Sequence, residues 1–126
     1  MPKILIVDDE PHIRLLLEQT LEEIEDAGVE LLIAENGQVA LEIIKNEKPN
    51  LVFLDVMMPK MNGFDVCNAV KNELGMNDVY IILLTAKGQE FDKQKGKTAG
   101  ADQYLTKPFN PDEIVSKTIE ILGLSL

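Results

Sequence analysis

Residues 4–10 read Ile-Leu-Ile-Val-Asp-Asp-Glu, four apolar residues followed directly by three acidic ones. A short continuous apolar run predicts a strand buried on both faces, as in a parallel sheet between two layers of helices. Similar runs recur along the chain and predict four further strands. They occupy residues 31–34, 51–54, 81–84 and, more weakly, 104–105.

Helix-like segments separate these runs. Gly75 predicts the end of the third helix, and Asn110 followed by Pro111 predicts the start of the last. The segment 89–99 is a weaker helix because it contains few apolar residues. The alternation predicts an α/β fold of the doubly wound (βα)5 type, a three-layer sandwich. Apolar residues recur at helical spacing within residues 13–24, 40–44, 64–74 and 115–122.

Composition narrows the functional classes. The 126 residues carry 12 Lys plus Arg against 22 Asp plus Glu, a formal net charge of −10, and 45% are apolar. This predicts one domain spanning residues 1–126. A surface this acidic repels phosphate backbones, and we therefore expect no direct nucleic-acid binding. The longest apolar run, 79–84, is far shorter than the roughly 20 residues that span a bilayer, and no signal region precedes the first strand, which favours the cytoplasm.

Polar residues follow the predicted strands. Asp8 and Asp9 follow the first, Asp55 the third, Thr85 the fourth and Lys107 comes just after the fifth. Each taken alone is an ordinary loop residue. In an open parallel sheet, however, chemistry collects beyond the carboxyl ends of the strands. We therefore expect these five side chains to face one crevice.

Three converging carboxylates raise one another's pKa unless a cation is present. Their oxygen atoms suit a hard divalent ion, Mg²⁺ best of all, and Lys107 indicates a further anion such as a phosphoryl group. The acidic residues also argue against a nucleotide site, because no glycine follows the first strand to cradle phosphate. Of the remaining reactive residues, Cys67 reads as a small core residue and His12 as a surface residue.

In this order, several fragments resemble the receiver domain of bacterial two-component response regulators, the chemotaxis-regulator-like family with a flavodoxin-like fold. The resemblance implies the sheet order 2-1-3-4-5. It also implies that the chain is a signalling switch that turns over no separate substrate. The fragments are residues 4–10, 54–59, 62–63, 84–86, 100–101 and 104–109.

The resemblance assigns roles to the polar residues. Asp55 is the implied phosphoacceptor, which takes a phosphoryl group from a histidine kinase or a histidine phosphotransfer domain. Asp8 and Asp9 are implied to hold Mg²⁺ together with Asp55 and the backbone carbonyl of Met57. Lys107 supplies a positive charge and precedes an implied cis bond to proline.

Thr85 and Tyr104 are the implied switch residues. They would convey phosphorylation to the surface formed by the fourth helix, the fifth strand and the fifth helix, and so to a downstream effector or a fused output domain. Met57 and Lys87 lie beside the site, and we expect them to give a moderately long-lived phosphoryl group by shielding it and pairing with it. Four lysines in residues 87–97 offer a contact for an acidic partner, or equally a solvated charge run: Lys87, Lys93, Lys95 and Lys97.

Two other functional classes share this fold. A phosphorylation-independent scaffold of receiver type would be favoured by loss of an acidic residue or the lysine, and none is lost. A metal-dependent phosphatase needs a residue that activates water or binds substrate, and the sequence offers no candidate. The phosphorylated switch remains the leading interpretation.

Overall fold

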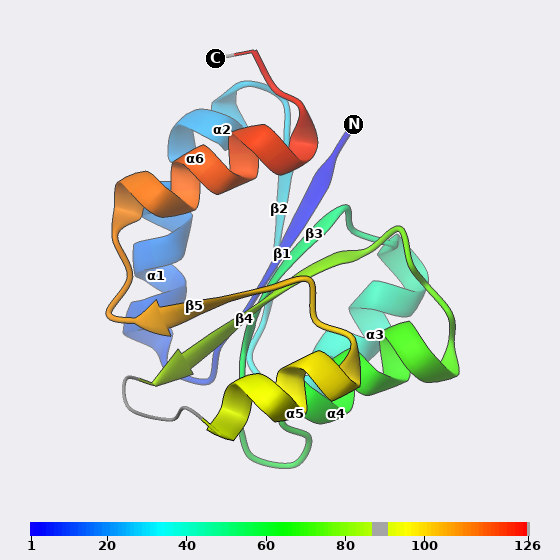
Figure 1. Ribbon diagram of the computed structural model, residues 1–126. Helices are drawn as coiled ribbons and strands as arrows, with labels where there is room; N and C mark the ends of the chain where they lie inside the picture. Colours follow the sequence, from blue (N-terminus) through cyan, green and yellow to red (C-terminus); the bar gives the residue numbers. More distant parts are fainter. Residues whose placement is uncertain (87–90, 126) are drawn as a thin grey trace.

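The computed structural model describes residues 1–86 and 91–125 and contains a five-stranded parallel sheet in the order β2-β1-β3-β4-β5 (Figure 1). The fold class and the strand order expected from the sequence are confirmed. The strands are β1 (Lys3–Val7), β2 (Glu30–Ala34), β3 (Leu51–Asp55), β4 (Tyr80–Ala86) and β5 (Gln103–Lys107).

Helices cover both faces of the sheet, which confirms the three-layer sandwich. In Figure 1, α1, α2 and α6 lie on one side of the strands, and α3, α4 and α5 lie on the other. Among the described residues, no helix is both long and apolar enough to cross a membrane. The helical elements are α1 (Pro11–Thr20), α2 (Glu22–Asp26), α3 (Gly37–Glu47), α4 (Gly63–Asn68), the π-helical segment η1 (Ala69–Glu73), α5 (Phe91–Ala99) and α6 (Pro111–Leu122).

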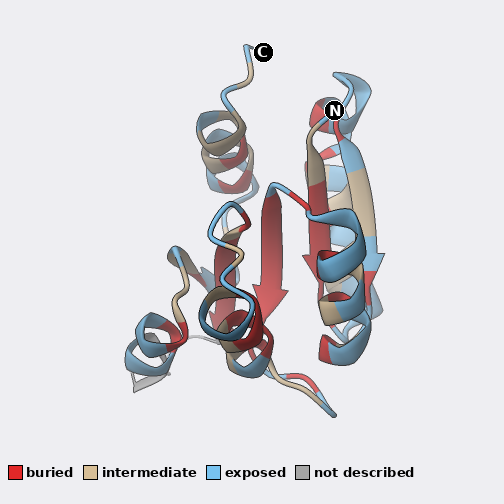
Figure 2. Cartoon of the chain, turned by 90° about the vertical axis from the view of Figure 1, so that its right-hand side faces the viewer, coloured by how far each residue is buried: buried red, intermediate tan, exposed pale blue. Residues whose placement is uncertain are grey.

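The central strands are buried on both faces, as their continuous apolar runs predict (Figure 2). Leu5 and Val7 of β1 belong to the core that includes α3 and α4 residues, whereas Ile4 and Ile6 belong to the core that includes α1 and α6 residues. The edge strands β2 and β5 keep exposed residues. The apolar run of β5 is therefore weak in the sequence because only one side chain of the strand is fully buried.

The first helix differs from the sequence expectation, because it is divided into α1 and α2 at Leu21. The Thr20 hydroxyl donates a hydrogen bond to the Leu16 carbonyl at 2.7 Å, a contact that bends helices. Leu21 has φ −97° and ψ 10°, outside helical geometry. Leu21 and Ile24 are nevertheless fully buried. The bend therefore keeps the apolar stripe on the core.

The third helix also departs from a regular helix in its second half. The Leu74 N–H donates to the Ala69 carbonyl, five residues back, at 2.8 Å, which is the π-helical pattern of η1. Gly75 has φ +64° and ends the segment, as predicted. Cys67 is fully buried, which confirms its interpretation as a core residue. At the last helix, the Asn110 side chain accepts a hydrogen bond from the Asp112 N–H at 2.8 Å, as its capping position predicts.

Candidate functional site

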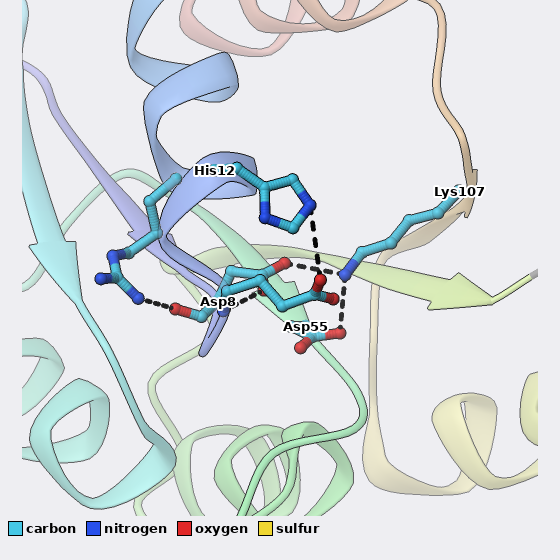
Figure 3. Close-up of polar contacts among 6 residues, drawn as sticks. Asp8, His12, Asp55 and Lys107 are labelled. Carbon is cyan, nitrogen blue, oxygen red and sulfur yellow. Dashed lines mark hydrogen bonds and ion pairs between the residues drawn. The ribbon is translucent and has the colours of Figure 1, made fainter.

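Asp8, Asp55 and Lys107 meet at the carboxyl end of the sheet (Figure 3). Asp8 directly follows β1, and Asp55 and Lys107 are the last residues of β3 and β5. The Lys107 Nζ lies 2.8 Å from Oδ2 of Asp8 and 3.1 Å from Oδ1 of Asp55. The parallel sheet thus joins residues up to 99 positions apart in the sequence.

Both carboxylates of this group are buried. Asp8 is 0% exposed, Asp55 is 4% exposed, and the Lys107 side chain is 18% exposed. A charge withdrawn from water is tolerated only when it is paired. Here two buried carboxylates share one ammonium group, so the three side chains carry a net negative charge when all are ionised. The Lys107–Pro108 peptide bond is cis, as the resemblance implies.

The pKa values of Asp55 and Lys107 reflect this excess of negative charge. Burial and the neighbouring Asp8 charge raise the pKa of Asp55 to about 7, although Lys107 acts to lower it. For Lys107, burial acts to lower the pKa, but the hydrogen bond from Lys107 to Asp8 and the charges of both carboxylates outweigh it and raise the pKa. Lys107 therefore stays charged at neutral pH, whereas Asp55 is divided between its two protonation states.

The start of α1 fixes Asp8. The Oδ1 of Asp8 accepts a hydrogen bond from the Glu10 N–H at 2.9 Å, and the Asp8 carbonyl accepts one from the Arg14 guanidinium at 2.7 Å. The sequence analysis assigned Arg14 no role. The available signal was its position: Arg14 is the one arginine of the chain and lies four residues after Glu10, one turn along the helix.

Asp8, Asp9 and Glu10 form an acidic cluster in which one carboxylate oxygen of each lies within 4.8 Å of the others. Asp9 and Glu10 are exposed, whereas Asp8 is buried. Mg²⁺ prefers a few carboxylate oxygens and keeps several of its waters, so these residues fit the ion. Asp55 is tied to Asp8 through Lys107 rather than through this cluster. The sequence analysis gave Glu10 no ligand role.

His12 lies at the rim of the site. Its side chain is 73% exposed, in agreement with its interpretation as a surface residue, and its Nε2 lies 3.4 Å from Oε2 of Glu10. Figure 3 shows the His12 ring above the carboxylates. His12 therefore contributes to the edge of the site and not to its buried centre.

Thr85, Tyr104 and Met57 are buried to different degrees. The register partner of Asp55 on β4 is Leu84, so Thr85, which is 5% exposed, lies one residue beyond it at the same end of the sheet. Tyr104 lies on β5 and is half-buried, and burial raises the pKa of its hydroxyl. The Met57 side chain, in the loop after β3, is 63% exposed.

The four lysines of residues 87–97 are only partly described. Lys87 and the side chain of Lys93 lie outside the described residues. Lys95 and Lys97 are exposed on α5, and the Lys95 ammonium lies 6.0 Å from the centre of the Phe64 ring. The expected pairing of Lys87 with a phosphoryl group stays a prediction.

Comparison with known proteins identifies sequence relatives. The sequence matches the family model of the response regulator receiver domain over residues 4–119. The probable transcriptional regulator ycf27 of Porphyra purpurea is 47% identical over 120 residues, which are 95% of this chain and 47% of that protein. The alkaline phosphatase synthesis transcriptional regulatory protein PhoP of Bacillus subtilis is 44% identical over 123 residues, 98% of this chain and 49% of that protein. The chain spans about half the length of the curated relatives it matches.

Solved structures of similar length share the fold. A putative response regulator from Chloroflexus aurantiacus J-10-fl superposes with a TM-score of 0.86 at 35% identity, covering 98% of this chain and 100% of that one. The BeF3-activated DrrB receiver domain superposes with a TM-score of 0.82 at 30% identity, covering 98% and 99%. The similarity therefore extends over the whole sheet and both helical layers.

Proposed function

Because this chain belongs to the response regulator receiver domain family, we propose that it is a phosphorylation-activated switch of a two-component system, with Asp55 as the phosphoacceptor. One observation carries this assignment. The buried Asp55 carboxylate lies 3.1 Å from a lysine ammonium at the carboxyl end of the sheet, beside a cluster of acidic side chains. The site thus combines a nucleophile with a fixed positive charge.

The proposed reaction is an in-line transfer to Asp55. An oxygen of the Asp55 carboxylate forms a bond to the phosphorus of a phosphohistidine on a partner protein. The phosphorus–nitrogen bond breaks, and its electron pair returns to the imidazole of the donor. The product on Asp55 is an acyl phosphate. Asp55 must be ionised to attack, and Lys107 favours that form by acting to lower the pKa of the carboxyl.

The residues for a Mg²⁺ ion are Asp8 and Asp9, with Asp55 and the backbone carbonyl of Met57. When bound, Mg²⁺ supplies positive charge that offsets the charges of the carboxylates and of the phosphoryl oxygens. Arg14 and the Glu10 N–H hold Asp8 in place for this task. Lys107 neutralises the phosphoryl group from the β5 side as a compact cation.

Phosphorylation then favours one of two packings of the same chain. The Thr85 hydroxyl would bond a phosphoryl oxygen, and the Tyr104 ring would move into the space that opens. The affected surface is formed by α5, β5 and α6. Removal of the phosphoryl group by water restores the first packing, so the chain modifies itself and turns over no separate substrate.

The proposed partners follow from this chemistry. The phosphoryl donor is a histidine kinase or a histidine phosphotransfer domain in the cytoplasm, and the receiver of the signal is an effector or a fused output domain. The matched relatives are named as transcriptional regulators, and about half of their length lies beyond the match. We propose that this receiver domain itself makes no direct contact with nucleic acid, because its net charge is −10.

Intact-mass measurement tests the assignment. Incubation with acetyl phosphate and Mg²⁺ should add one phosphoryl group, chelation of the metal should abolish the addition, and Asp55→Asn should abolish it as well. The exposed Asp78→Asn is the matched control and should react normally. An added group that persists in Asp55→Asn overturns the assignment of Asp55. Absence of any addition to the unmodified protein favours a phosphorylation-independent scaffold.

A further inference from the structure

Gly96 of α5 lies directly against the ring of Tyr104. A Cβ atom placed on Gly96 would lie 2.5 Å from Cε1 and 3.4 Å from Cδ1 of Tyr104, and 2.8 Å from Cδ1 of Leu83. The distances to Tyr104 Cε1 and to Leu83 Cδ1 are far below ordinary van der Waals contact. Tyr104 and Leu83 are register partners on β5 and β4. The ring therefore occupies the space that any side chain at position 96 would need.

Helical preference alone does not favour glycine at this position. Glycine in a helix interior loses more backbone entropy on folding than alanine does, so alanine is the better helix former. The helix α5 is also poor in apolar residues. Glycine, an unfavourable residue in such a helix, indicates that position 96 allows the close approach of the Tyr104 ring.

The carboxyl end of α5 is capped by backbone hydrogen bonds from the two residues that follow it. The Ala101 N–H donates to the Gly96 carbonyl at 2.9 Å, and the Gly100 N–H donates to the Lys97 carbonyl at 3.1 Å. Gly100 has φ +94°, so these two hydrogen bonds form the helix-ending arrangement that requires a left-handed residue. The last turn of α5, which includes Gly96, is therefore closed by its own backbone.

Contacts from α4 and η1 hold the same end from the side. The Asn72 side chain donates to the Thr98 carbonyl at 3.3 Å, and the Cys67 Sγ lies 3.4 Å from the Ala99 carbonyl. Just beyond the helix, Lys71 pairs with Asp102 at 2.9 Å, and the Lys71 side chain is 7% exposed. Since this end of α5 is held on several sides, a methyl group at position 96 would displace the Tyr104 ring before it displaced the helix.

We propose that Gly96 is the positioning residue of the Tyr104 switch. Because Gly96 has no side chain, the Tyr104 ring can lie directly against the backbone of α5, and this contact couples the ring to the surface of α5. The inference rests on the proposed function, because it concerns how the signal leaves the phosphorylation site. When the ring moves, the contact at Gly96 is lost, and α5 loses this contact with β5. Gly96 does not touch the reacting atoms, so it acts through Tyr104.

A double-mutant cycle tests the contact independently of phosphorylation. Gly96→Ala should lower the free energy of unfolding in urea, because the methyl group and the ring compete for one space. In a Tyr104→Ala background the same substitution should destabilise the protein much less, because only the close approach to Leu83 Cδ1 then remains and alanine favours the helix. Lys97→Ala, on an exposed neighbouring position, should have the same effect in both backgrounds. Equal destabilisation by Gly96→Ala in both backgrounds overturns the inference.

Tyrosine fluorescence provides the readout that a purely structural role would not move. The chain has two tyrosines and no tryptophan, so Tyr80→Phe leaves Tyr104 as the one strong fluorophore. In this background, Gly96→Ala should increase quenching of Tyr104 by acrylamide. Beryllofluoride with Mg²⁺, a mimic of the acyl phosphate, should change the quenching when Gly96 is present and change it much less with Gly96→Ala.

Phosphorylation of Asp55, followed by intact mass, separates the two proposals. If Asp55 reacts equally with and without Gly96→Ala while the fluorescence response is reduced, the positioning role is supported. If Asp55 reacts and the fluorescence response is unchanged by Gly96→Ala, the inference is overturned and the proposed function stands. If the unmodified protein takes no phosphoryl group, the proposed function fails and the inference fails with it, whatever the result of the double-mutant cycle.

Discussion

At the scale of single residues, the ammonium group of Lys107 lies between two buried carboxylates, Asp8 and Asp55. One positive charge cannot neutralise both, and the raised pKa of Asp55, about 7, expresses the difference. Burial is the largest cause, followed by the charge of Asp8. The folded protein therefore carries an electrostatic cost at neutral pH that a bound cation would relieve.

The first prediction concerns stability and pH. The folded pKa of Asp55, about 7, is above the ordinary aspartate pKa of 3.8, so the folded state binds this proton more tightly and loses stability as pH rises from about 4 to about 7. Asp55→Asn removes the charge. Relative to the unmodified protein, its free energy of unfolding without Mg²⁺ should rise with pH across this window, to a gain on the order of 1–3 kcal/mol at pH 8.

Urea unfolding at several pH values measures this gain. Asp78→Asn, at an exposed position, is the control and should show no comparable pH-dependent gain. A gain for Asp55→Asn that is already complete at pH 4, or a loss at pH 8, contradicts the assignment of the raised pKa to Asp55.

Met57 carries the second prediction. Its side chain is apolar, 63% exposed and two residues after the proposed phosphoacceptor, a position from which it would shield an acyl phosphate from water. Met57→Asn should shorten the lifetime of the phosphoryl group, by about tenfold if the barrier to hydrolysis falls by 1.4 kcal/mol. Mass spectrometry after removal of acetyl phosphate follows the decay. An unchanged decay rate means that Met57 does not control access of water.

At the scale of elements, two helix starts hold the loop that carries Met57. A Cβ on Gly63 of α4 would clash with the Asp55 carbonyl oxygen, and a Cβ on Gly37 of α3 would clash with the Met61 carbonyl oxygen. The Gly63 N–H also donates to the Val56 carbonyl at 2.9 Å. Both close approaches are to backbone atoms, which cannot change rotamer to make room. The loop is thus fixed at its two ends.

Gly63→Ala should therefore move the backbone of Asp55 itself. We expect a loss of about 1–3 kcal/mol in the free energy of unfolding and a slower phosphorylation of Asp55 by acetyl phosphate. The control is Gly75→Ala: Gly75 has φ +64° and nothing within 4 Å of its Cβ position, so alanine there is strained without a clash. It should lower stability by about 1–2 kcal/mol and leave the phosphorylation rate unchanged. Equal rates in the two variants would contradict this account of Gly63.

Elements also show what could and could not be predicted from the sequence. The strands and the burial of Cys67 follow from apolar runs, which report burial directly. The break at Leu21 does not, because Leu17, Leu21 and Ile24 keep helical spacing whether or not the Thr20 hydroxyl bends the chain. The strand order came from resemblance to a family, since apolar runs do not specify which strands are neighbours.

The site divides in the same way. The meeting of Asp8, Asp55 and Lys107 was predictable because each follows a parallel strand, and the carboxyl ends of such strands share one edge. The roles of Glu10 and Arg14 were not, because they depend on where side chains of the first helical turn point. The contact between the Tyr104 ring and Gly96 lies between a strand and a helix, and no local sequence pattern predicts such a contact.

At the scale of the whole molecule, charge is distributed unevenly over the two faces. The first 35 residues contain ten acidic residues against Lys3 and Arg14, and they form β1, α1, α2 and β2. The exposed Lys95 and Lys97 lie on α5, on the opposite side of the sheet from α1 and α2 (Figure 1). A charged partner therefore meets different potentials on the two helical layers.

The two cores share one sheet, so the fourth prediction is that the chain unfolds as one cooperative unit. Ile44 of α3 and Ile114 of α6 are fully buried in different cores. Ile44→Val and Ile114→Val should each lower the free energy of unfolding by about 1 kcal/mol and shift the same transition.

Tyr80 and Tyr104 also pack against different cores, so Tyr104→Phe and Tyr80→Phe each leave one tyrosine fluorophore, on opposite sides of the sheet. Their unfolding midpoints should coincide with that from circular dichroism, and separated midpoints would mean that the layers unfold independently.

The distance in sequence between Asp8 and Lys107, 99 residues, has a further consequence. The contact forms only after β1, β3, β4 and β5 have aligned side by side, so a chain that is still emerging from the ribosome or is misfolded lacks the complete group of Asp8, Asp55 and Lys107. Such non-local contacts are slow to form during folding. The proposed transfer to Asp55 would therefore be confined to completely folded copies of the chain.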